Sequence, residues 1–150
     1  MKALVQRVSH ASVRTQEPDR TAAIGRGVLV LLGVEAGDGP AEADWIAAKL
    51  PRLRIFPDAE GRMNRDLSAV AGAILLVSQF TLAGDCRRGN RPSFASAAPP
   101  EEGRRLYERV RDRLTEAGVR VETGVFGVAM QVELLNDGPV TLIVERRPGD

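Results

Sequence analysis

The sequence is poor in the residues on which many hydrolases and metal sites depend. Cys86 is the only cysteine and His10 the only histidine among 150 residues. A single cysteine cannot form an intramolecular disulfide, which agrees with a reducing compartment. The two counts exclude a His/Cys zinc site of ordinary composition and leave one candidate for a histidine general base.

The chain also lacks an excess of charge of either sign, and it lacks long apolar runs. The formal net charge is +1, so the chain is not basic over its whole surface and any contact with nucleic acid must be local. No stretch approaches the roughly 20 apolar residues that span a bilayer, and polar residues near Met1 interrupt any signal-peptide core. We therefore expect a cytoplasmic protein without a membrane partner.

What is present is typical of one globular domain covering residues 1–150. The chain is 43% apolar and 27% charged, and a chain of this length buries roughly 70% of the surface of its unfolded form. Residues 28–34 and 73–77 are apolar runs too short for surface helices, which predicts strands buried on both faces. Further strands are predicted at residues 3–13, 53–56, 119–123, 130–135 and 140–145, with a hairpin connection at 15–21.

Two helices are predicted. Pro40 suits the first turn of a helix that should end or kink at Pro51, and residues 99–100 begin a second helix with Gly118 as its C-terminal cap. Two helices among about seven strands indicate an α/β protein with a mixed sheet rather than a regular βα repeat. A Rossmann fold is excluded because neither strand-to-helix junction carries the glycine fingerprint.

Two short segments are the candidate functional motifs. Ser78-Gln79-Phe80-Thr81-Leu82 ends the second apolar run, and open sheets often bind ligands where a buried strand gives way to a polar loop. The alternative is that Ser78 and Thr81 only satisfy backbone groups at the strand end. The other segment is Asn136-Asp137-Gly138-Pro139-Val140-Thr141, which by itself predicts a hairpin turn between two strands.

Together the two segments resemble the signature motifs of the D-aminoacyl-tRNA deacylases, and the likeness extends from the first strand to Val144. These enzymes hydrolyse the ester that joins a D-amino acid, or glycine, to the 3′ end of tRNA. The resemblance implies β-sheet layers with helices packed on one side, a homodimer, no cofactor, and aminoacyl-tRNA rather than DNA as the partner.

The resemblance also implies a role for the first segment. Ser78, Gln79, Phe80 and Thr81 would form the catalytic pocket floor, and the main chain of Phe80 and Thr81 would stabilise the oxyanion. The Thr81 hydroxyl is one candidate for the attacking group, although a threonine needs an adjacent base and no histidine lies nearby in sequence. The alternative, which we favour, is that the 2′-hydroxyl of the terminal adenosine activates water.

For the second segment, the resemblance implies a test of chirality. Gly138 and Pro139, joined by a cis bond, would reach into the partner's pocket, bind the substrate amino group and leave no room for an L side chain. Glycine would still be accepted, since it has no side chain to exclude. Arg7 would brace this element; the alternative is an arginine that reaches solvent at a sheet edge.

Other residues are implied to contact the substrate. Phe126 would pack near the terminal adenine and Met130 would form a wall beside the Gly-Pro loop, although aromatic and Met residues between strands are more often core. Arg87, Arg88 and Arg91 could meet acceptor-end phosphates or be simply solvated. Two rival functions remain open: a noncatalytic module that binds the tRNA end, and a hydrolase of small D-amino acid esters.

Overall fold

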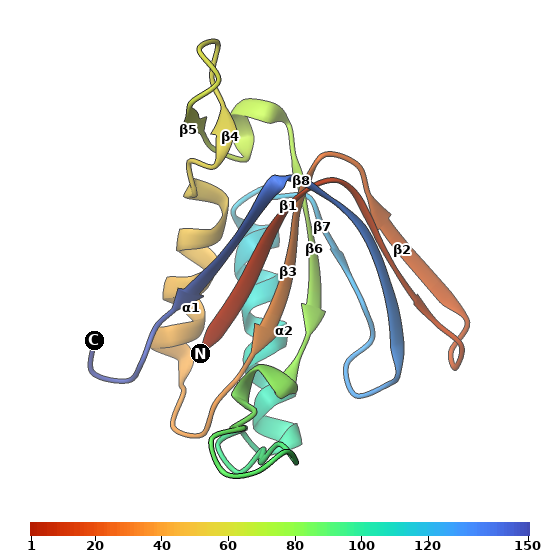
Figure 1. Ribbon diagram of the computed structural model, residues 1–150, viewed down its shortest axis with the longest axis vertical. Helices are drawn as coiled ribbons and strands as arrows, with labels where there is room; N and C mark the ends of the chain where they lie inside the picture. The colour runs from red at the N-terminus through yellow and green to blue at the C-terminus, as the bar shows by residue number, and fades with distance from the viewer.

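The computed structural model describes residues 1–150 as a mixed β-sheet with two α-helices (Figure 1). The sheet has the order β2-β1-β3-β6-β7, and β8 pairs with β1. β1 runs antiparallel to β2, β3 and β8, whereas β3, β6 and β7 are parallel. β4 and β5 form a separate small sheet. The strand bounds are β1 Lys2–Thr15, β2 Arg20–Ile24, β3 Gly27–Gly33, β4 Phe56–Pro57, β5 Met63–Arg65, β6 Ala73–Ser78, β7 Val121–Thr123 and β8 Met130–Glu145.

The apolar strands β3 and β6 are buried on both faces, which confirms the prediction from their unbroken apolar sequences. One face packs against the two helices and shares a cluster of 21 buried residues with them. The other face packs against the second half of β1 and against β2, in a cluster of nine buried residues. The members of the smaller cluster are Val8, Ala11, Val13, Ala22, Ile24, Leu29, Ala73, Leu75 and Val77.

The two helices begin and end as the sequence predicts. α1 (Pro40–Lys49) and α2 (Pro100–Glu116) each start with a proline, where the missing N–H removes no helical hydrogen bond. A 3₁₀ turn at Leu50–Arg52 follows α1. Gly118 follows α2 with a φ of 77°, a left-handed conformation that glycine adopts without strain. Neither helix is long and apolar enough to cross a membrane.

Asp44 connects the two helices. Its carboxylate accepts hydrogen bonds from Arg109 at 2.7 and 2.8 Å and from Arg113 at 3.1 Å. These arginines, Arg109 first, hold the pKa of Asp44 below its usual value. The remaining pairs on α2, Arg105 with Glu102 among them, lie on its exposed face, so the charge pattern of this helix serves both the surface and the contact with α1.

The structure corrects the expected hairpin at residues 136–139. β8 is one continuous strand of 16 residues that pairs with β1 along nearly its whole length. Register shifts occur between Gln6 and Val8 and between Val8 and His10. Because the long β1 offers a partner on both sides of the Gly-Pro pair, the irregular residues are absorbed as a bulge instead of a turn.

Three smaller predictions also need correction. The strand expected at residues 53–56 is limited to β4, whose short partner β5 was not predicted. The strand expected at 119–123 begins two residues later, as β7. β2 was not predicted at all, because its five residues begin inside the stretch interpreted as a connection.

Candidate active site

A cavity of about 610 Å³ opens where β6 ends. Ser78 is the last residue of β6, Gln79 follows it, and Phe80 begins a 3₁₀ turn that ends at Ala83. Most of the lining is apolar, and it comes from β3, β6, β8, the N-terminal half of α2 and the loops beside them. The lining residues are Leu32, Val34, Val77, Ser78, Gln79, Phe80, Ala97, Ala98, Pro100, Gly103, Tyr107, Phe126, Gly127, Val128, Met130 and Val132.

Three of the four residues of the expected catalytic segment therefore line one cavity, and Thr81 does not. The Thr81 side chain is exposed, and its hydroxyl accepts a hydrogen bond from Nε2 of Gln79. The N–H groups of Phe80 and Thr81 begin the 3₁₀ turn, so they have no acceptor within it. The segment thus offers backbone donors beside the cavity.

Phe126 and Met130 both line this cavity, as does Tyr107, which sequence analysis missed. The ring of Phe126 lies 5.8 Å from the ring of Tyr107, centroid to centroid. The Tyr107 hydroxyl donates a 2.8 Å hydrogen bond to the carbonyl of Leu76 in β6. Burial raises the pKa of Tyr107 to about 12. The only signal for Tyr107 was its place among the buried positions of α2.

The cavity lining contains no carboxylate, histidine, cysteine, lysine or arginine. His10, the one histidine, is exposed on β1 opposite Leu135 and does not line the cavity. Tyr107 is the only ionisable side chain in the lining, and it is protonated at neutral pH, as any tyrosine with a pKa of 10 or above would be. The side chains of this chain that line the cavity therefore include no group of the usual general-base type.

Arg7 organises the second candidate segment from within β1. Its side chain is buried, and its Nε donates to the carbonyl of Asp137 at 3.1 Å and lies 3.2 Å from the Asp137 carboxylate. Nη1 donates to the carbonyl of Ile55 at 2.6 Å. Asn136 donates to the carbonyls of Arg7 at 2.9 Å and Val140 at 3.0 Å. Arg7 thus has the carbonyl and carboxylate partners that its burial requires, rather than a path to solvent.

The Gly-Pro pair itself is exposed. The bond between Gly138 and Pro139 is cis, and Gly138 has a φ of 126°. A Cβ atom at Gly138 would lie 2.8 Å from Nη2 of Arg7 and 2.9 Å from Cγ2 of Val140. Both the backbone conformation and the close approach of Arg7 therefore favour glycine here.

The two candidate segments do not meet within one chain. Arg7 pairs with Val28 of β3, whereas Ser78 pairs with Leu32 four residues further along the same strand. Four residues of strand span about 13 Å. Likewise Met130, which lines the cavity, is eight residues from Gly138 along β8, or about 26 Å. The Gly-Pro element and the cavity of the same chain are thus separate surfaces.

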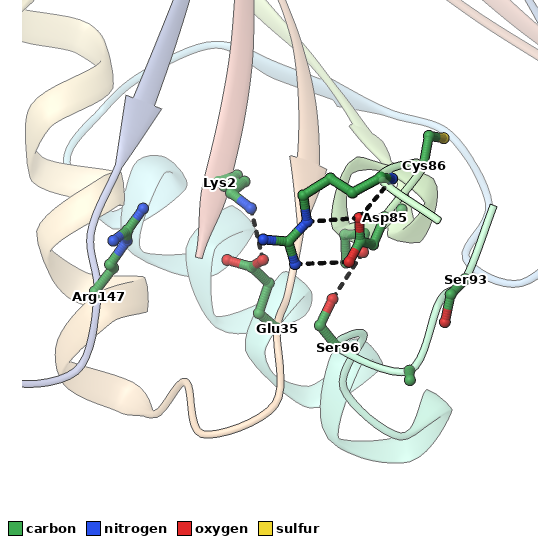
Figure 2. A pocket seen from close by; sticks show the side chains of 11 residues that line it. Lys2, Glu35, Asp85, Cys86, Ser93, Ser96 and Arg147 are labelled. Atoms are coloured by element: carbon green, nitrogen blue, oxygen red, sulfur yellow. Dashed lines mark hydrogen bonds and ion pairs between the residues drawn. The ribbon is translucent and has the colours of Figure 1, made fainter. Parts of the chain in front are cut away.

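A second cavity, of about 800 Å³, lies beside the loop that follows Ala83, and its lining is mainly polar (Figure 2). Lys2 reaches Glu35 across it at 2.7 Å. Arg87 forms two hydrogen bonds with the Asp85 carboxylate, at 2.9 and 2.7 Å. Its charged side chains are therefore largely satisfied by one another, which makes it a poorer candidate for a reaction site than the apolar cavity.

Comparisons with known proteins show which family the chain resembles. The family model described as D-Tyr-tRNA(Tyr) deacylase matches residues 4–145. A protein of Anaeromyxobacter dehalogenans named D-aminoacyl-tRNA deacylase is 58% identical over 147 residues, covering 98% of each chain.

Two solved structures have the same fold. The structure titled "c-Myc DNA Unwinding Element Binding Protein" superposes with a TM-score of 0.89 and 38% identity, over 98% of this chain and 99% of that one. A structure described as a probable eukaryotic D-amino acid tRNA deacylase, 20% identical, superposes with a TM-score of 0.80 over 95% and 97% of the two chains. From the family match over almost the whole length and the high identity to its named relative, the chain belongs to the D-Tyr-tRNA(Tyr) deacylase family.

Proposed function

We propose that the protein is a D-aminoacyl-tRNA deacylase, which hydrolyses the ester between a D-amino acid and the terminal adenosine of tRNA. Membership of the family supports this function, and the observation that carries it is the apolar cavity at the end of β6. Ser78, Gln79 and Phe80 line it at the end of β6, and Phe126 and Met130 line it as well. The cavity is large enough for an aminoacyl group and part of a nucleoside.

The substrate supplies the group that activates water. The cavity lining lacks a general base, and Tyr107 is held protonated with its hydroxyl donating to a carbonyl. The 2′-hydroxyl of the terminal adenosine lies next to the ester that breaks. Water adds to the ester carbonyl and passes a proton to the 2′-hydroxyl, which passes its own proton to the 3′ oxygen as the ester bond breaks. The backbone N–H groups of Phe80 and Thr81 stabilise the tetrahedral oxyanion. Thr81 is a poor nucleophile here because its exposed hydroxyl has no base beside it.

Selection against L-amino acids is made by the Gly138–Pro139 element of a second subunit. Within one chain this element is too far from the cavity to reach it, and β8 exposes the apolar side chains of Leu135 (54%) and Ile143 (70%). We assign these exposed side chains to the homodimer contact. The carbonyls of Gly138 and Pro139 accept hydrogen bonds from the substrate amino group and occupy the space into which an L side chain would project.

The backbone of the Gly138–Pro139 element, here called the gate, contacts the substrate around its α-carbon and not at its side chain. It therefore accepts many D-amino acids, and it also accepts glycine, so glycyl-tRNA, including tRNA(Ala) mischarged with glycine, is a substrate. Arg7 and Asn136 hold the gate from β1 and from within the segment. A pocket shaped around one side chain could not combine this breadth with chiral selection.

The decisive experiment compares deacylation of D-tyrosyl-, L-tyrosyl- and glycyl-tRNA by the wild type, Pro139→Ala and the control Pro148→Ala, which changes an exposed proline near the C-terminus. We expect the wild type and the control to cleave the D and glycyl esters only, and Pro139→Ala to lose the preference for D over L. If all three esters survive the wild type, the noncatalytic binding module replaces this proposal.

Two further arms test the mechanism. A D-tyrosyl-tRNA that ends in 2′-deoxyadenosine should resist the enzyme, whereas Thr81→Ala should retain most of its activity. The opposite pair of results would make Thr81 the nucleophile. Equal cleavage of the deoxy substrate and of small D-amino acid esters would support the RNA-independent hydrolase instead.

A further inference from the structure

Two exposed aromatic rings lie beside the apolar cavity, one of them in its lining. Phe80 is 59% exposed and Phe94 is 39% exposed, although the chain has only four phenylalanines. The rings meet edge to face, with centroids 5.2 Å apart and an interplanar angle of 70°. Phe80 also lines the cavity, so the pair extends the cavity wall outward. The reaction described above uses only the backbone of Phe80 and does not use Phe94 at all.

The loop from Gly84 to Ser96 holds Phe94 in this position. Asp85 and Ser93 exchange two backbone hydrogen bonds, of 2.8 and 2.9 Å, and Ser96 donates a 2.7 Å hydrogen bond to the carbonyl of Ala83. A Cβ atom at Gly84 would lie 3.0 Å from the Phe94 ring, so the missing side chain lets the ring lie against the 3₁₀ turn. Figure 2 shows the base of this loop, with Asp85, Ser93 and Ser96 close together. The aromatic pair is therefore presented by a closed loop.

The same loop carries two free positive charges. Arg87 is neutralised by Asp85, whose pKa falls to about 2 because Arg87 donates hydrogen bonds to it. Arg88 and Arg91 are exposed and form no ion pair. In a chain with a net charge of only +1, the loop therefore has a local positive excess next to exposed rings. Rings that can stack on bases, beside arginines that can meet phosphates, are typical of surfaces that bind single-stranded RNA.

We propose that the Phe94 ring, supported from the side by Phe80, stacks on the base that precedes the terminal adenosine of the substrate, and that Arg88 and Arg91 bind the phosphates of that single-stranded end. This inference rests on the proposed function, which puts the terminal adenosine in the cavity. The preceding nucleotide then lies outside the cavity, and the exposed Phe80 in the lining, with Phe94 against it, is a surface that it can reach. An RNA end supplies both the flat bases and the negative charge that this surface matches.

Substrates of different length test the stacking contact. We compare wild type, Phe94→Ala and Phe94→Tyr on D-tyrosyl-adenosine and on the D-tyrosyl ester of the trinucleotide CCA. Loss of one stacked base should raise KM for the trinucleotide ester about tenfold in Phe94→Ala, with kcat unchanged, and Phe94→Tyr should restore it. KM for the adenosine ester should be the same in all three proteins. An equal loss on both esters, or on neither, would overturn the proposal.

The phosphate contacts are tested by salt dependence. The double variant Arg88→Gln/Arg91→Gln is compared with Arg111→Gln, which removes a charge from the C-terminal half of α2, where Arg111 pairs with Asp112. The ligand is a CCA-ended RNA that carries no amino acid. In the double variant, the slope of log affinity against log salt should become shallower by about 1.4, or about 0.7 for each phosphate contact. The slope of Arg111→Gln should match the wild type. Unchanged slopes in both would refute the phosphate contacts.

Binding also separates this proposal from the proposed function. The affinities of the trinucleotide CCA without an amino acid and of adenosine are measured for the wild type and for Phe94→Ala. Neither measurement requires catalysis. A wild type that binds CCA more tightly than adenosine, with the difference lost in Phe94→Ala, supports the stacking surface even if no ester is cleaved. A wild type that cleaves D-tyrosyl-tRNA but shows no such difference retains the function and refutes the surface.

Discussion

Substitution of Tyr107 by phenylalanine should change how stability depends on pH. The hydroxyl of Tyr107 donates to the Leu76 carbonyl in β6, two residues before Ser78, and burial raises the pKa from 10.0 to about 12. The folded protein thus binds the phenolic proton more tightly than the unfolded chain does. This contribution is fully present below about pH 10 and is lost as the pH rises through about 12.

The size of the effect follows from the shift. Two pKa units correspond to about 2.7 kcal/mol of differential stability, taking 1.36 kcal/mol for each unit. Phenylalanine has no proton to lose, so Tyr107→Phe lacks this alkaline loss. It does lose the hydrogen bond to Leu76, which costs about 1 kcal/mol at neutral pH. The variant should therefore be less stable at pH 7 and become the more stable protein above about pH 11.

Urea unfolding of both proteins from about pH 7 to about pH 11.5 measures this crossing. Tyr107 is the only tyrosine, so ultraviolet absorbance of the folded wild type reports its titration directly. Stability curves that stay parallel over the whole range, or a tyrosine that titrates near pH 10 in the folded state, would refute the reasoning. In either case the Tyr107 hydroxyl would not be isolated from water by burial.

Arg7→Met should lower the free energy of unfolding in urea by about 3 kcal/mol, because two backbone carbonyls lose a charged donor. Arg7→Lys should recover only part of that stability, because lysine lacks the planar guanidinium group. A loss below about 0.5 kcal/mol in Arg7→Met would contradict this. Gly138→Ala should cost about 1 to 3 kcal/mol by thermal unfolding, because a Cβ would strain the backbone and meet Arg7. Gly61→Ala, at a φ of 79° and with nothing within 4 Å of the added Cβ, should cost less. Asp44 contributes stability that is present above about pH 4 and is lost as the pH falls through its lowered pKa. Asp44→Asn should remove this contribution, which is less than about 1 kcal/mol because the ion pairs are partly exposed. Identical acid unfolding curves for the two proteins would exclude this linkage.

The sequence predicts the buried strands and both helices well, because each depends on its own apolar pattern and on local proline and glycine signals. The Gly138–Pro139 segment shows where such signals fail. A Gly-Pro pair between two apolar runs favours a turn, but β1 is long enough to pair with both runs, and Arg7 binds the bulge that results. The pairing of β8 with β1 makes this segment part of a continuous strand, and the local sequence around Gly138 gives no sign of that pairing.

The candidate site could be predicted from the sequence only in part. Ser78, Gln79 and Phe80 could be placed at a pocket because a buried strand ends there, and they do line the cavity. Tyr107 could not, since its place in the lining depends on how α2 is rotated against β6. The Ile55 carbonyl that holds Arg7 was equally inaccessible, because a backbone acceptor has no sequence signature. The roles given to these residues stay predictions.

The double burial of β3 and β6 sets how protection from hydrogen exchange should vary across the molecule. Each of these strands has a neighbour on both sides, and apolar clusters cover both of their faces. Their amides can reach solvent only when the whole domain opens, whereas the loop from Gly84 to Ser96 can open by itself. The apolar cavity lies at the boundary between the slowest and the faster exchanging regions. Residues at its rim can therefore change without loosening the buried strands β3 and β6.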